Sequence, residues 1–528
     1  MSYKILVPEG ITSRGAEILR AEGWEVDIHQ KAAPPEELAK MVPPYHALLI
    51  RSGSKVTADV IEAAVNMKVI GRPGVGVDNV DIPAATRRGI MVMNSPQGNM
   101  VSTAELTMSL MLALARNVAP ADASMKSGTW DRKSFAGVEL QKKRIGIVGL
   151  GRIGREVAQR CRAFNMEVVG YDPFVSPQAL EAVRVTLVSL DELFATCDYI
   201  TLHTTLTDDT RQLVNRERLA KCKPGLRIVN AARGKLIDDE ALLEALDSGK
   251  LAGAALDVHT NEPPKDWRLA KHPKVLATPH LGAQTKEAQE RVGTDIAVQV
   301  RDFLKSGAIQ QAVNFFSLSG DPHDQMRPAM LLAERLGSLV GQMTTGMPQR
   351  IELNLYGELT ELDAKPILAA AVTGVLKPLL DQSVTIVNAV ALAKENGVVA
   401  AESSSTTPVA YSNLMEIRVQ RSDQQHSVAG TLFGGNHQRM VELDGVEIDA
   451  IPLGHLLLVR NNDTPGVVGA IGTHLGKRAI NIARMTVGRQ PGTGALMLIE
   501  VDAEVPKEVV REVAGITGVR EARALHLG

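Results

Sequence analysis

Residues 144–172 read RIGIVGLGRIGREVAQRCRAFNMEVVGYD, and this stretch sets the architecture of the chain around it. It opens with an apolar, β-branched run, Arg144–Val148, which is typical of a buried parallel strand. A G-x-G-x-x-G motif follows at once, and the next residues have the spacing of one helix face. A second apolar run, Glu167–Tyr171, ends on Asp172. The stretch therefore predicts a βαβ unit.

The glycine spacing predicts a dinucleotide site in this unit. Gly149 permits a tight turn, Gly151 lets the backbone approach a pyrophosphate, and Gly154 lets helix and strand pack closely. Asp172, 18 residues after Gly154, is placed to accept a hydrogen bond from a ribose 2′-hydroxyl. No Lys or Arg follows it within three residues, which favours NAD over NADP. The alternative is an ordinary α/β turn.

Composition limits the classes of protein that the chain can belong to. Its 528 residues suggest about three or four domains, and its net charge of −2 argues against a nucleic-acid binder. No apolar run approaches 18 residues, and the first ten do not resemble a signal peptide, so no membrane partner is expected. Three cysteines without a CxxC pair indicate a reducing compartment. These features predict a cytoplasmic α/β protein without a metal site.

The first 94 residues alternate short β-rich runs with helical stretches but lack the glycine motif. This arrangement predicts that the nucleotide domain is inserted into a smaller α/β domain. Two loops there can bind a ligand: Arg51–Gly53, and the glycine-dense segment Gly71–Asp78. The alternative for each loop is a plain turn with a surface arginine.

Three ionisable side chains, Arg233, Glu262 and His280, each follow a predicted strand of the nucleotide domain. Open α/β sheets bind their ligands at the carboxyl ends of the strands. His280 is the candidate base, Glu262 would orient its ring, and Arg233 would hold a substrate carboxylate with its planar fork. Taken singly, each has an ordinary alternative: a surface histidine, a helix-capping glutamate, or an arginine in an ion pair.

The last 200 residues differ in character from the core. From residue 317 to 450, helices and strands alternate with polar joints such as Glu402–Pro408, and no catalytic constellation is visible. Residues 454–528 read β-α-β-β-α-β, which predicts a ferredoxin-like module.

Residues 1–315 resemble the D-isomer-specific 2-hydroxyacid dehydrogenases. The resemblance rests on GLGRIG, NAARG at 230–234, Asp257 with Glu262–Pro263, and PHLGA at 279–283, in this order. It implies the substrate role of Arg233 and an acid/base pair of Glu262 and His280. The NAD-binding positions would be Gly149, Gly151, Arg152, Ile153, Gly154, Asp172, Thr204, Ala231, Ala232, Asp257, Gly282 and Ala283, and the substrate-binding positions Arg51, Val75, Gly76 and Asn99.

Within this family, the whole chain resembles the long members that oxidise 3-phosphoglycerate. The resemblance implies a Rossmann-type NAD domain (98–284) inserted in a flavodoxin-like substrate domain (1–97 and 285–316), an α+β intervening domain (317–450) and a ferredoxin-like ACT domain (453–528). It also implies a homotetramer and an L-serine site with Asp463 and Asn481. A phosphorylated substrate would need cations beyond Arg233, and Arg51, Arg72 and Arg132, the last from a neighbouring subunit, are available.

The predicted function is therefore NAD-dependent oxidation of 3-phospho-D-glycerate to 3-phosphohydroxypyruvate, the first step of L-serine biosynthesis. One alternative is another D-2-hydroxyacid dehydrogenase or a glyoxylate or hydroxypyruvate reductase, and a second is a non-enzymatic NAD sensor of the corepressor kind. Three residues depart from the family pattern: Thr205 replaces a proline, Lys235 a glycine, and His259 an aromatic residue.

Overall fold

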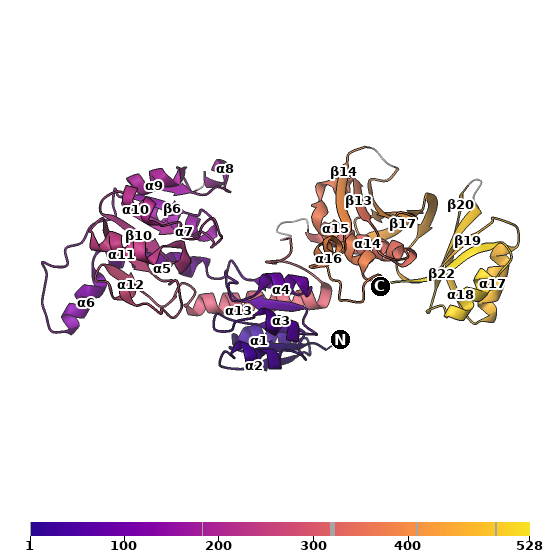
Figure 1. Cartoon of the computed structure of the whole chain (residues 1–528), viewed down its shortest axis with the longest axis horizontal. Coiled ribbons are helices and arrows are strands. Elements are labelled where there is room, and N and C mark those ends of the chain that lie inside the picture. Colours follow the sequence, from indigo (N-terminus) through magenta and orange to yellow (C-terminus); the bar gives the residue numbers. More distant parts are fainter. Residues whose placement is uncertain (1, 182, 317–322, 408–409, 491–493) are drawn as a thin grey trace.

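Four sheets follow one another along the chain in an elongated molecule (Figure 1). The structure, a computed structural model, describes residues 2–181, 183–316, 323–407, 410–490 and 494–528. Residue 317, the predicted start of the intervening domain, lies outside the described residues. The predicted fold class is confirmed by the strand order of each sheet. No helix of the described part is long and apolar enough to cross a membrane.

The first sheet is parallel, with the order β2-β1-β3-β4-β5, which is the flavodoxin-like order. Four of its strands are mostly buried because helices cover both faces, whereas the edge strand β2 is only partly buried. The strands are β1 (Lys4–Val7), β2 (Glu25–Ile28), β3 (Ala47–Leu49), β4 (Val69–Arg72) and β5 (Met91–Asn94), and the helices are α1 (Ser13–Arg20), α2 (Pro35–Met41), α3 (Ala58–Ala63) and α4 (Ile82–Arg87).

The second sheet has the order β12-β11-β10-β9-β6-β7-β8, which is the Rossmann order with one strand added. Its strands are β6 (Arg144–Val148), β7 (Glu167–Tyr171), β8 (Thr186–Leu187), β9 (Tyr199–Leu202), β10 (Leu226–Asn230), β11 (Leu251–Leu256) and β12 (Val275–Ala277). Its helices are α7 (Arg152–Ala163), α8 (Pro177–Leu180), α9 (Leu190–Thr196), α10 (Arg216–Lys221), η1 (Gly234–Leu236), α11 (Asp239–Asp247) and α12 (Arg268–Lys271).

Two helices connect the first sheet with the second. The chain leaves through α5 (Met100–Ala115), an apolar helix that packs on α7 and the second sheet, and returns through α13 (Lys286–Ser306). Between α5 and β6, helix α6 (Val118–Lys126) leaves the body as an arm (Figure 1). No residue of α6 is buried within the chain.

The third sheet is mixed, with the order β14-β13-β15-β16-β17-β18. Residues 402–405 belong to its edge strand β14, so the prediction of a polar joint there is wrong, and Pro408 lies outside the described residues. An edge strand can pair through its backbone alone and needs no apolar side chains. The elements are β13 (Arg350–Gly357), β14 (Val399–Ser405), β15 (Asn413–Gln420), β16 (Gln425–Phe433), β17 (His437–Leu443), β18 (Val446–Ala450), α14 (His323–Met343), η2 (Glu358–Glu361), α15 (Ala364–Leu376) and α16 (Ala389–Glu395).

A short loop fixes this third unit to the first. Thr385 Oγ1 donates to the Gly89 carbonyl at 3.0 Å, and Asn388 Nδ2 donates to the carbonyl of Arg87, the last residue of helix α4, at 3.1 Å. Between them, Ile386 and Val387 pack against the apolar core of the first sheet. The loop therefore joins the two units through both polar and apolar contacts.

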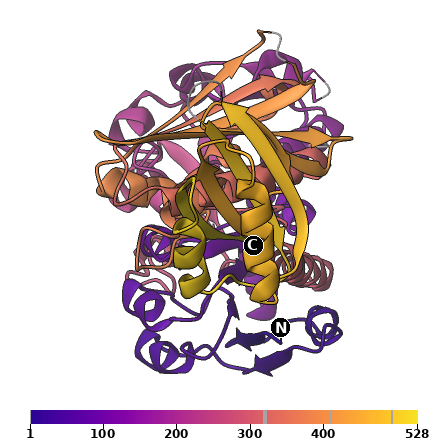
Figure 2. The same ribbon diagram turned by 90° about the vertical axis from the view of Figure 1, so that its right-hand side faces the viewer.

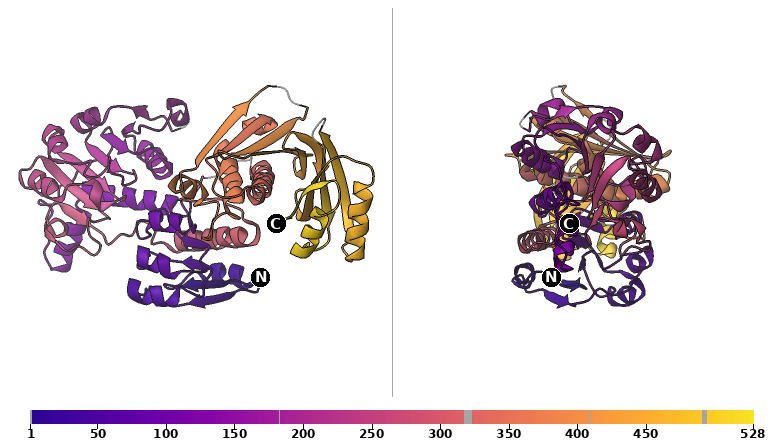
Figure 3. Two further views of the ribbon diagram at one scale, coloured as in Figure 1. Left: turned by 45° about the vertical axis from the view of Figure 1, so that its right-hand side comes forward. Right: turned by 90° about the vertical axis from the view of Figure 1, so that its left-hand side faces the viewer.

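The fourth sheet has the order β20-β21-β19-β22, the ferredoxin-like arrangement predicted from the sequence. It stands beside the third sheet in the left view of Figure 3 and lies in front of it in Figure 2. One face packs on the third unit and the other on α17 and α18. The elements are β19 (Gly454–Asn461), α17 (Val467–Lys477), β20 (Ile482–Gln490), β21 (Gly494–Val501), α18 (Lys507–Ala514) and β22 (Val519–Leu527).

Candidate active site

The glycine-rich turn lies where the strand order of the second sheet reverses, between β6 and β9. Gly149 has a φ of 93°, and a Cβ added to it would lie 2.6 Å from the His203 carbonyl oxygen. A Cβ added to Gly154 would overlap the Gly149 carbonyl, so α7 can approach only because Gly154 has no side chain. A Cβ on Gly151 would meet nothing within 4 Å. The space before the N-terminus of α7 is therefore open, as a bound pyrophosphate requires.

Asp172 follows β7 and supports the same turn. Its carboxylate accepts hydrogen bonds from the Leu150 N–H at 2.8 Å and the Phe174 N–H at 2.9 Å. Each carboxylate oxygen has further lone-pair capacity, so a ribose hydroxyl can still donate to it. The turn and Asp172 thus fit the adenosine end of NAD.

The other predicted cofactor residues lie in the first turn of α7 or after strands of the same sheet. Arg152 and Ile153 begin α7, Thr204 follows β9, Ala231 and Ala232 follow β10, and Asp257, Gly282 and Ala283 follow β11 and β12.

No group of three His, Cys, Asp or Glu side chains in the described part of the chain is arranged to hold a metal ion.

Glu262 and His280 form a direct pair. His280 Nδ1 lies 2.7 Å from Glu262 Oε2. With Glu262 ionised, Nδ1 must carry the proton, and Nε2 is left as the nitrogen that can accept one. Burial alone would raise the pKa of Glu262, but hydrogen bonds from the His280 ring and from the His259 N–H hold that pKa below its ordinary value. The pair can therefore take up a proton at His280 while Glu262 stays ionised.

Asp257 holds the loop that carries His280. This carboxylate is fully buried, and it accepts from Thr278 Oγ1 at 2.6 Å, the Leu281 N–H at 2.7 Å and the Gly282 N–H at 2.9 Å. The His280 N–H donates to the Asp257 carbonyl at 2.8 Å, and His280 has a φ of 57°. A non-glycine residue keeps this conformation only where its surroundings impose it, which is common at active sites.

Arg233 reaches across from the second sheet to the first. Its Nε donates to Asp78 at 2.8 Å, and a Cβ on Gly76 would overlap its guanidinium. The backbone that carries it is shaped by the buried Asn230, which accepts from the Ala232 N–H and donates to the Arg233 carbonyl. Arg233 is thus in an ion pair, which is the alternative given above to a substrate-binding role. The same ion pair also places Arg233 between the two sheets.

A second guanidinium lies close to Arg233. Arg72 ends β4, its Nη1 contacts the Gly76 carbonyl, and its buried Nε has no hydrogen-bond partner. Burial and the positive charge of Arg233 lower the pKa of Arg72 to about 10. Two cations near each other, one with an unused buried donor, form a site that favours an anion.

The remaining predicted substrate residues lie at different distances from Arg233: some are beside it and others are on separate segments. Val75 and Gly76 lie in the loop beside Arg233, and Asn99 precedes α5 with a buried, unpartnered Oδ1. Arg51 follows β3 and contacts Gln289. Arg132 lies on the exposed segment after α6, and no described contact links it to the other substrate residues.

Two residues that shape the site, Glu9 and Gln289, were not predicted from the sequence, and a third, Asp78, was predicted only as the last residue of the Gly71–Asp78 loop. Glu9 accepts from the backbone N–H of residues 51, 53 and 54 at 2.5–3.1 Å and so holds the Arg51 loop. Asp78 pairs with Arg233, and Gln289 contacts Arg51. Each acts on a residue far away along the chain, so no local motif identifies it.

Asp463 and Asn481 do not share one site within the chain. Asp463 follows β19 and pairs with Arg489, near the end of β20, at 3.2 Å. Asn481 precedes β20 and donates to Asp502 at 2.7 Å. The strand between residues 481 and 489 corresponds to about 25 Å. A ligand that touches both an Asp463 and an Asn481 side chain would therefore need a second chain to supply one of the two.

Comparison with known families gives one match to each of the last three units. Residues 108–282 match the D-isomer-specific 2-hydroxyacid dehydrogenase NAD-binding domain, residues 325–444 the D-3-phosphoglycerate dehydrogenase intervening domain, and residues 455–517 the ACT domain.

Curated relatives match nearly the whole chain. D-3-phosphoglycerate dehydrogenases from Archaeoglobus fulgidus and Methanocaldococcus jannaschii are 41% and 42% identical, each with 99% of this chain and 100% of the relative covered. The enzyme of the same name from Synechocystis is 40% identical, over 99% of this chain and 95% of its own length.

Solved structures match a smaller part. The TT0316 protein from Thermus thermophilus is 37% identical with a TM-score of 0.55. The match covers 59% of this chain and 99% of the TT0316 chain. A glyoxylate reductase from Paecilomyes thermophila is 30% identical with a TM-score of 0.55, over 59% of this chain and 98% of its own.

Proposed function

This chain belongs to the D-isomer-specific 2-hydroxyacid dehydrogenases, within the D-3-phosphoglycerate dehydrogenase family, and we propose that it oxidises 3-phospho-D-glycerate to 3-phosphohydroxypyruvate with NAD. This reaction is the first step of L-serine biosynthesis. The match over 99% of the chain, including the intervening and ACT domains, supports this reaction over that of the shorter reductases.

The observation that carries the proposal is the pair of guanidinium groups at the meeting point of the first two sheets. Arg233 can bind the substrate carboxylate with its planar fork. Arg72 has a buried Nε without a partner, and its pKa is lowered by burial and by Arg233. A phosphorylated acid would bring one anionic group for each of the two guanidinium groups, whereas an unphosphorylated acid would bring only its carboxylate.

The residues divide the chemistry among them. His280 Nε2 takes the proton from the substrate hydroxyl, and the ionised Glu262 stabilises the imidazolium that forms. Arg233 orients the carboxylate and draws charge toward the developing carbonyl. NAD, when bound, supplies the acceptor for the hydride that leaves the same carbon. For the reverse reaction His280 returns the proton.

The test of the substrate is NADH appearance at alkaline pH with the product trapped. We expect turnover of 3-phosphoglycerate, and we expect Arg72→Ala to raise its KM at least tenfold while sparing an unphosphorylated 2-hydroxy acid. Lys55→Ala, which removes an exposed cation from a nearby loop, is the matched control. Reduction of 2-keto acids without turnover of 3-phosphoglycerate would favour the reductase alternative.

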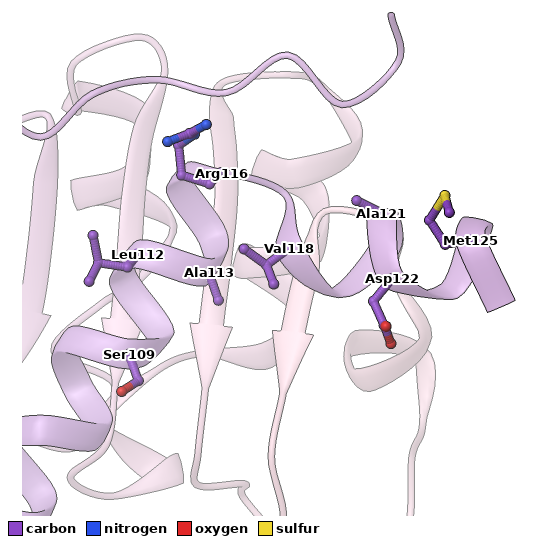
Figure 4. Close-up of a pocket in the computed structure, with 8 residues that line it drawn as sticks. All are labelled: Ser109, Leu112, Ala113, Arg116, Val118, Ala121, Asp122 and Met125. Carbon is purple, nitrogen blue, oxygen red and sulfur yellow. The ribbon is translucent and has the colours of Figure 1, made fainter. Parts of the chain in front are cut away.

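We propose that the chain works as a homotetramer, with one contact through the arm. Val118, Met125 and Trp130 are 53%, 54% and 76% exposed, and a groove runs between α5 and α6 (Figure 4). A nine-residue helix without a buried side chain is only marginally stable in water, so we expect a second copy to cover it. The same contact would carry Arg132 toward the site of the neighbouring copy.

The second contact would be made by the ACT unit. Asp463 and Asn481 lie at opposite ends of β20, so an L-serine site using both requires two copies side by side. Two self-complementary contacts at opposite ends of an elongated chain close into a tetramer when their two-fold axes are perpendicular and intersect, which is the arrangement that we propose (Figure 1). Light scattering should give four copies, and Trp130→Asp should give two. Serine inhibition of the wild type, lost in Asn481→Ala, would support the effector site.

A further inference from the structure

His259 lies between the three side chains that carry the proposed chemistry. It belongs to the loop after β11, three residues before Glu262. Its main-chain N–H donates to Glu262 Oε1 at 3.1 Å, so the second carboxylate oxygen, Oε2, is presented to His280. His259 therefore sets the direction of the Glu262 side chain through its backbone.

The ring of His259 makes a second connection. Its Nε2 lies 3.1 Å from the carbonyl oxygen of Thr278, two residues before His280. A carbonyl can only accept, so Nε2 carries a proton and donates it. The bond joins the loop after β11 to the end of β12, which are the two segments that carry Glu262 and His280.

The third connection is to the Arg233 loop. A Cβ added to Gly234 would overlap the backbone carbonyl of His259. The chain after Arg233 therefore lies directly on the His259–Thr260 peptide. A shift of this peptide would move Arg233 relative to His280.

We propose that His259 is a positioning residue that holds the Glu262–His280 pair in register with Arg233. The inference rests on the proposed function, because the roles of those three side chains do. An aromatic residue at this position could fill the same space, but it could not donate to Thr278. In this chain the hydrogen bond from the His259 ring to Thr278 helps to hold the two loops together, which an aromatic side chain would have to do by packing alone.

Two carboxylates face the ring. Glu262 lies on its own loop, and Asp239 lies in the first turn of α11, where burial raises the pKa of Asp239 and a hydrogen bond with Thr260, with the nearby His259, opposes that rise. The surroundings are thus acidic on both sides. A variant that removes the ring must keep a neutral donor in order to test the hydrogen bond apart from the charge.

The experiment compares His259→Phe with His259→Gln. Phenylalanine keeps the shape and loses the donor, whereas the glutamine amide lies the same number of bonds from Cα as the imidazole Nε2 and can donate to Thr278. We expect His259→Phe to lower kcat at least tenfold, with the KM for NAD and the NADH affinity, measured by fluorescence, within twofold of the wild type. His259→Gln should recover most of kcat.

The controls separate the possible failures. His272→Phe makes the same change at a histidine paired with Asp247, away from the site, and should keep kcat. If His280→Ala is active, His280 is not the general base, and that part of the proposed function is wrong. If His280→Ala is inactive but His259→Phe has wild-type kcat, the positioning role is wrong. A parallel loss of NADH affinity and melting temperature in both His259 variants would also overturn it, because it would indicate general loss of structure.

Discussion

The two junctions within this molecule are built from different interactions. The junction between the first and second sheets, here called the catalytic junction, is polar: Arg233 donates to Asp78 at 2.8 Å, and Gln289, on the helix that returns to the first sheet, donates to the Ala283 carbonyl after β12 at 2.8 Å. Within the described residues, no apolar cluster is shared by these two sheets.

The junction between the third and fourth sheets, here called the C-terminal junction, is a continuous core. Side chains of the fourth sheet are buried together with those of α14, β17 and β18 in one apolar cluster. The residues contributed by the fourth sheet are Leu456, Leu458, Leu496, Leu498, Leu525 and Leu527.

This contrast indicates which junction can move. Polar groups can exchange protein partners for water at little net cost, whereas separating two apolar faces exposes their whole area to water. We therefore expect the catalytic junction to open and close around a ligand. The third and fourth sheets should move together as one rigid body, so that a displacement of one sheet also displaces the other. Substitutions at the catalytic junction should affect kinetics, and those at the C-terminal junction should affect stability.

The largest effect should come from His280→Ala at the catalytic junction. Loss of the base should lower kcat by ~10²–10⁴, about 2.7–5.4 kcal/mol in the barrier, without a change in melting temperature. Steady-state NADH formation and a thermal melt measure the two quantities. A kcat within tenfold of the wild type would remove His280 from the mechanism.

The next effect should come from Leu498→Ala at the C-terminal junction. Truncating a buried leucine should lower the free energy of unfolding by about 2–5 kcal/mol and leave kcat unchanged. Hydrogen exchange should become faster in β18. Ile499→Ala is the matched control, because Ile499 faces α17 and α18 instead. Equal exchange in β18 for both variants would mean that the two sheets do not share one core.

A smaller, pH-dependent effect should come from Asp444→Asn in the turn between β17 and β18. Burial would raise the pKa of Asp444, but hydrogen bonds from the His426 ring and the Ser427 N–H, with the charge of Arg460, hold it below its ordinary value. Because the folded pKa lies below the unfolded one, the carboxylate stabilises the fold above about pH 4 and this contribution is lost as the pH falls through the folded pKa.

The variant should therefore lose about 1.5–3 kcal/mol of unfolding free energy at neutral pH and show less acid sensitivity than the wild type. Urea unfolding between pH 7 and pH 3 measures both. Parallel pH profiles for the two proteins would show that Asp444 does not couple to the C-terminal junction.

The smallest stability effect should come from Asp78→Ala at the catalytic junction. Its carboxylate side chain is 62% exposed, so the ion pair with Arg233 should contribute less than about 1 kcal/mol to stability. The KM for the substrate should still change, because Arg233 loses the group that orients it. A stability loss above 2 kcal/mol would contradict the contrast between the junctions.

Local patterns in the amino-acid sequence were enough to predict the βαβ unit, the Rossmann sheet and the ferredoxin-like module. In each case the signal is short-range: a glycine spacing, an apolar run or an alternation of helix and strand. The meeting of Arg233, Glu262 and His280 could also be predicted, because successive parallel strands place their carboxyl ends at one edge. Glu262 and His280 do form a direct pair, and Arg233 follows the neighbouring strand β10, while the catalytic roles of all three stay a prediction.

What each element contacts, by contrast, depends on the tertiary structure. The run Leu456–Val459 predicts burial on both faces of a strand, but not that one face meets the third sheet and the other α17 and α18. Glu9, Asp78 and the ring of His259 likewise act on residues distant in sequence. Local patterns specify which surface is buried, and the partner depends on how whole elements pack, so no short motif contains it.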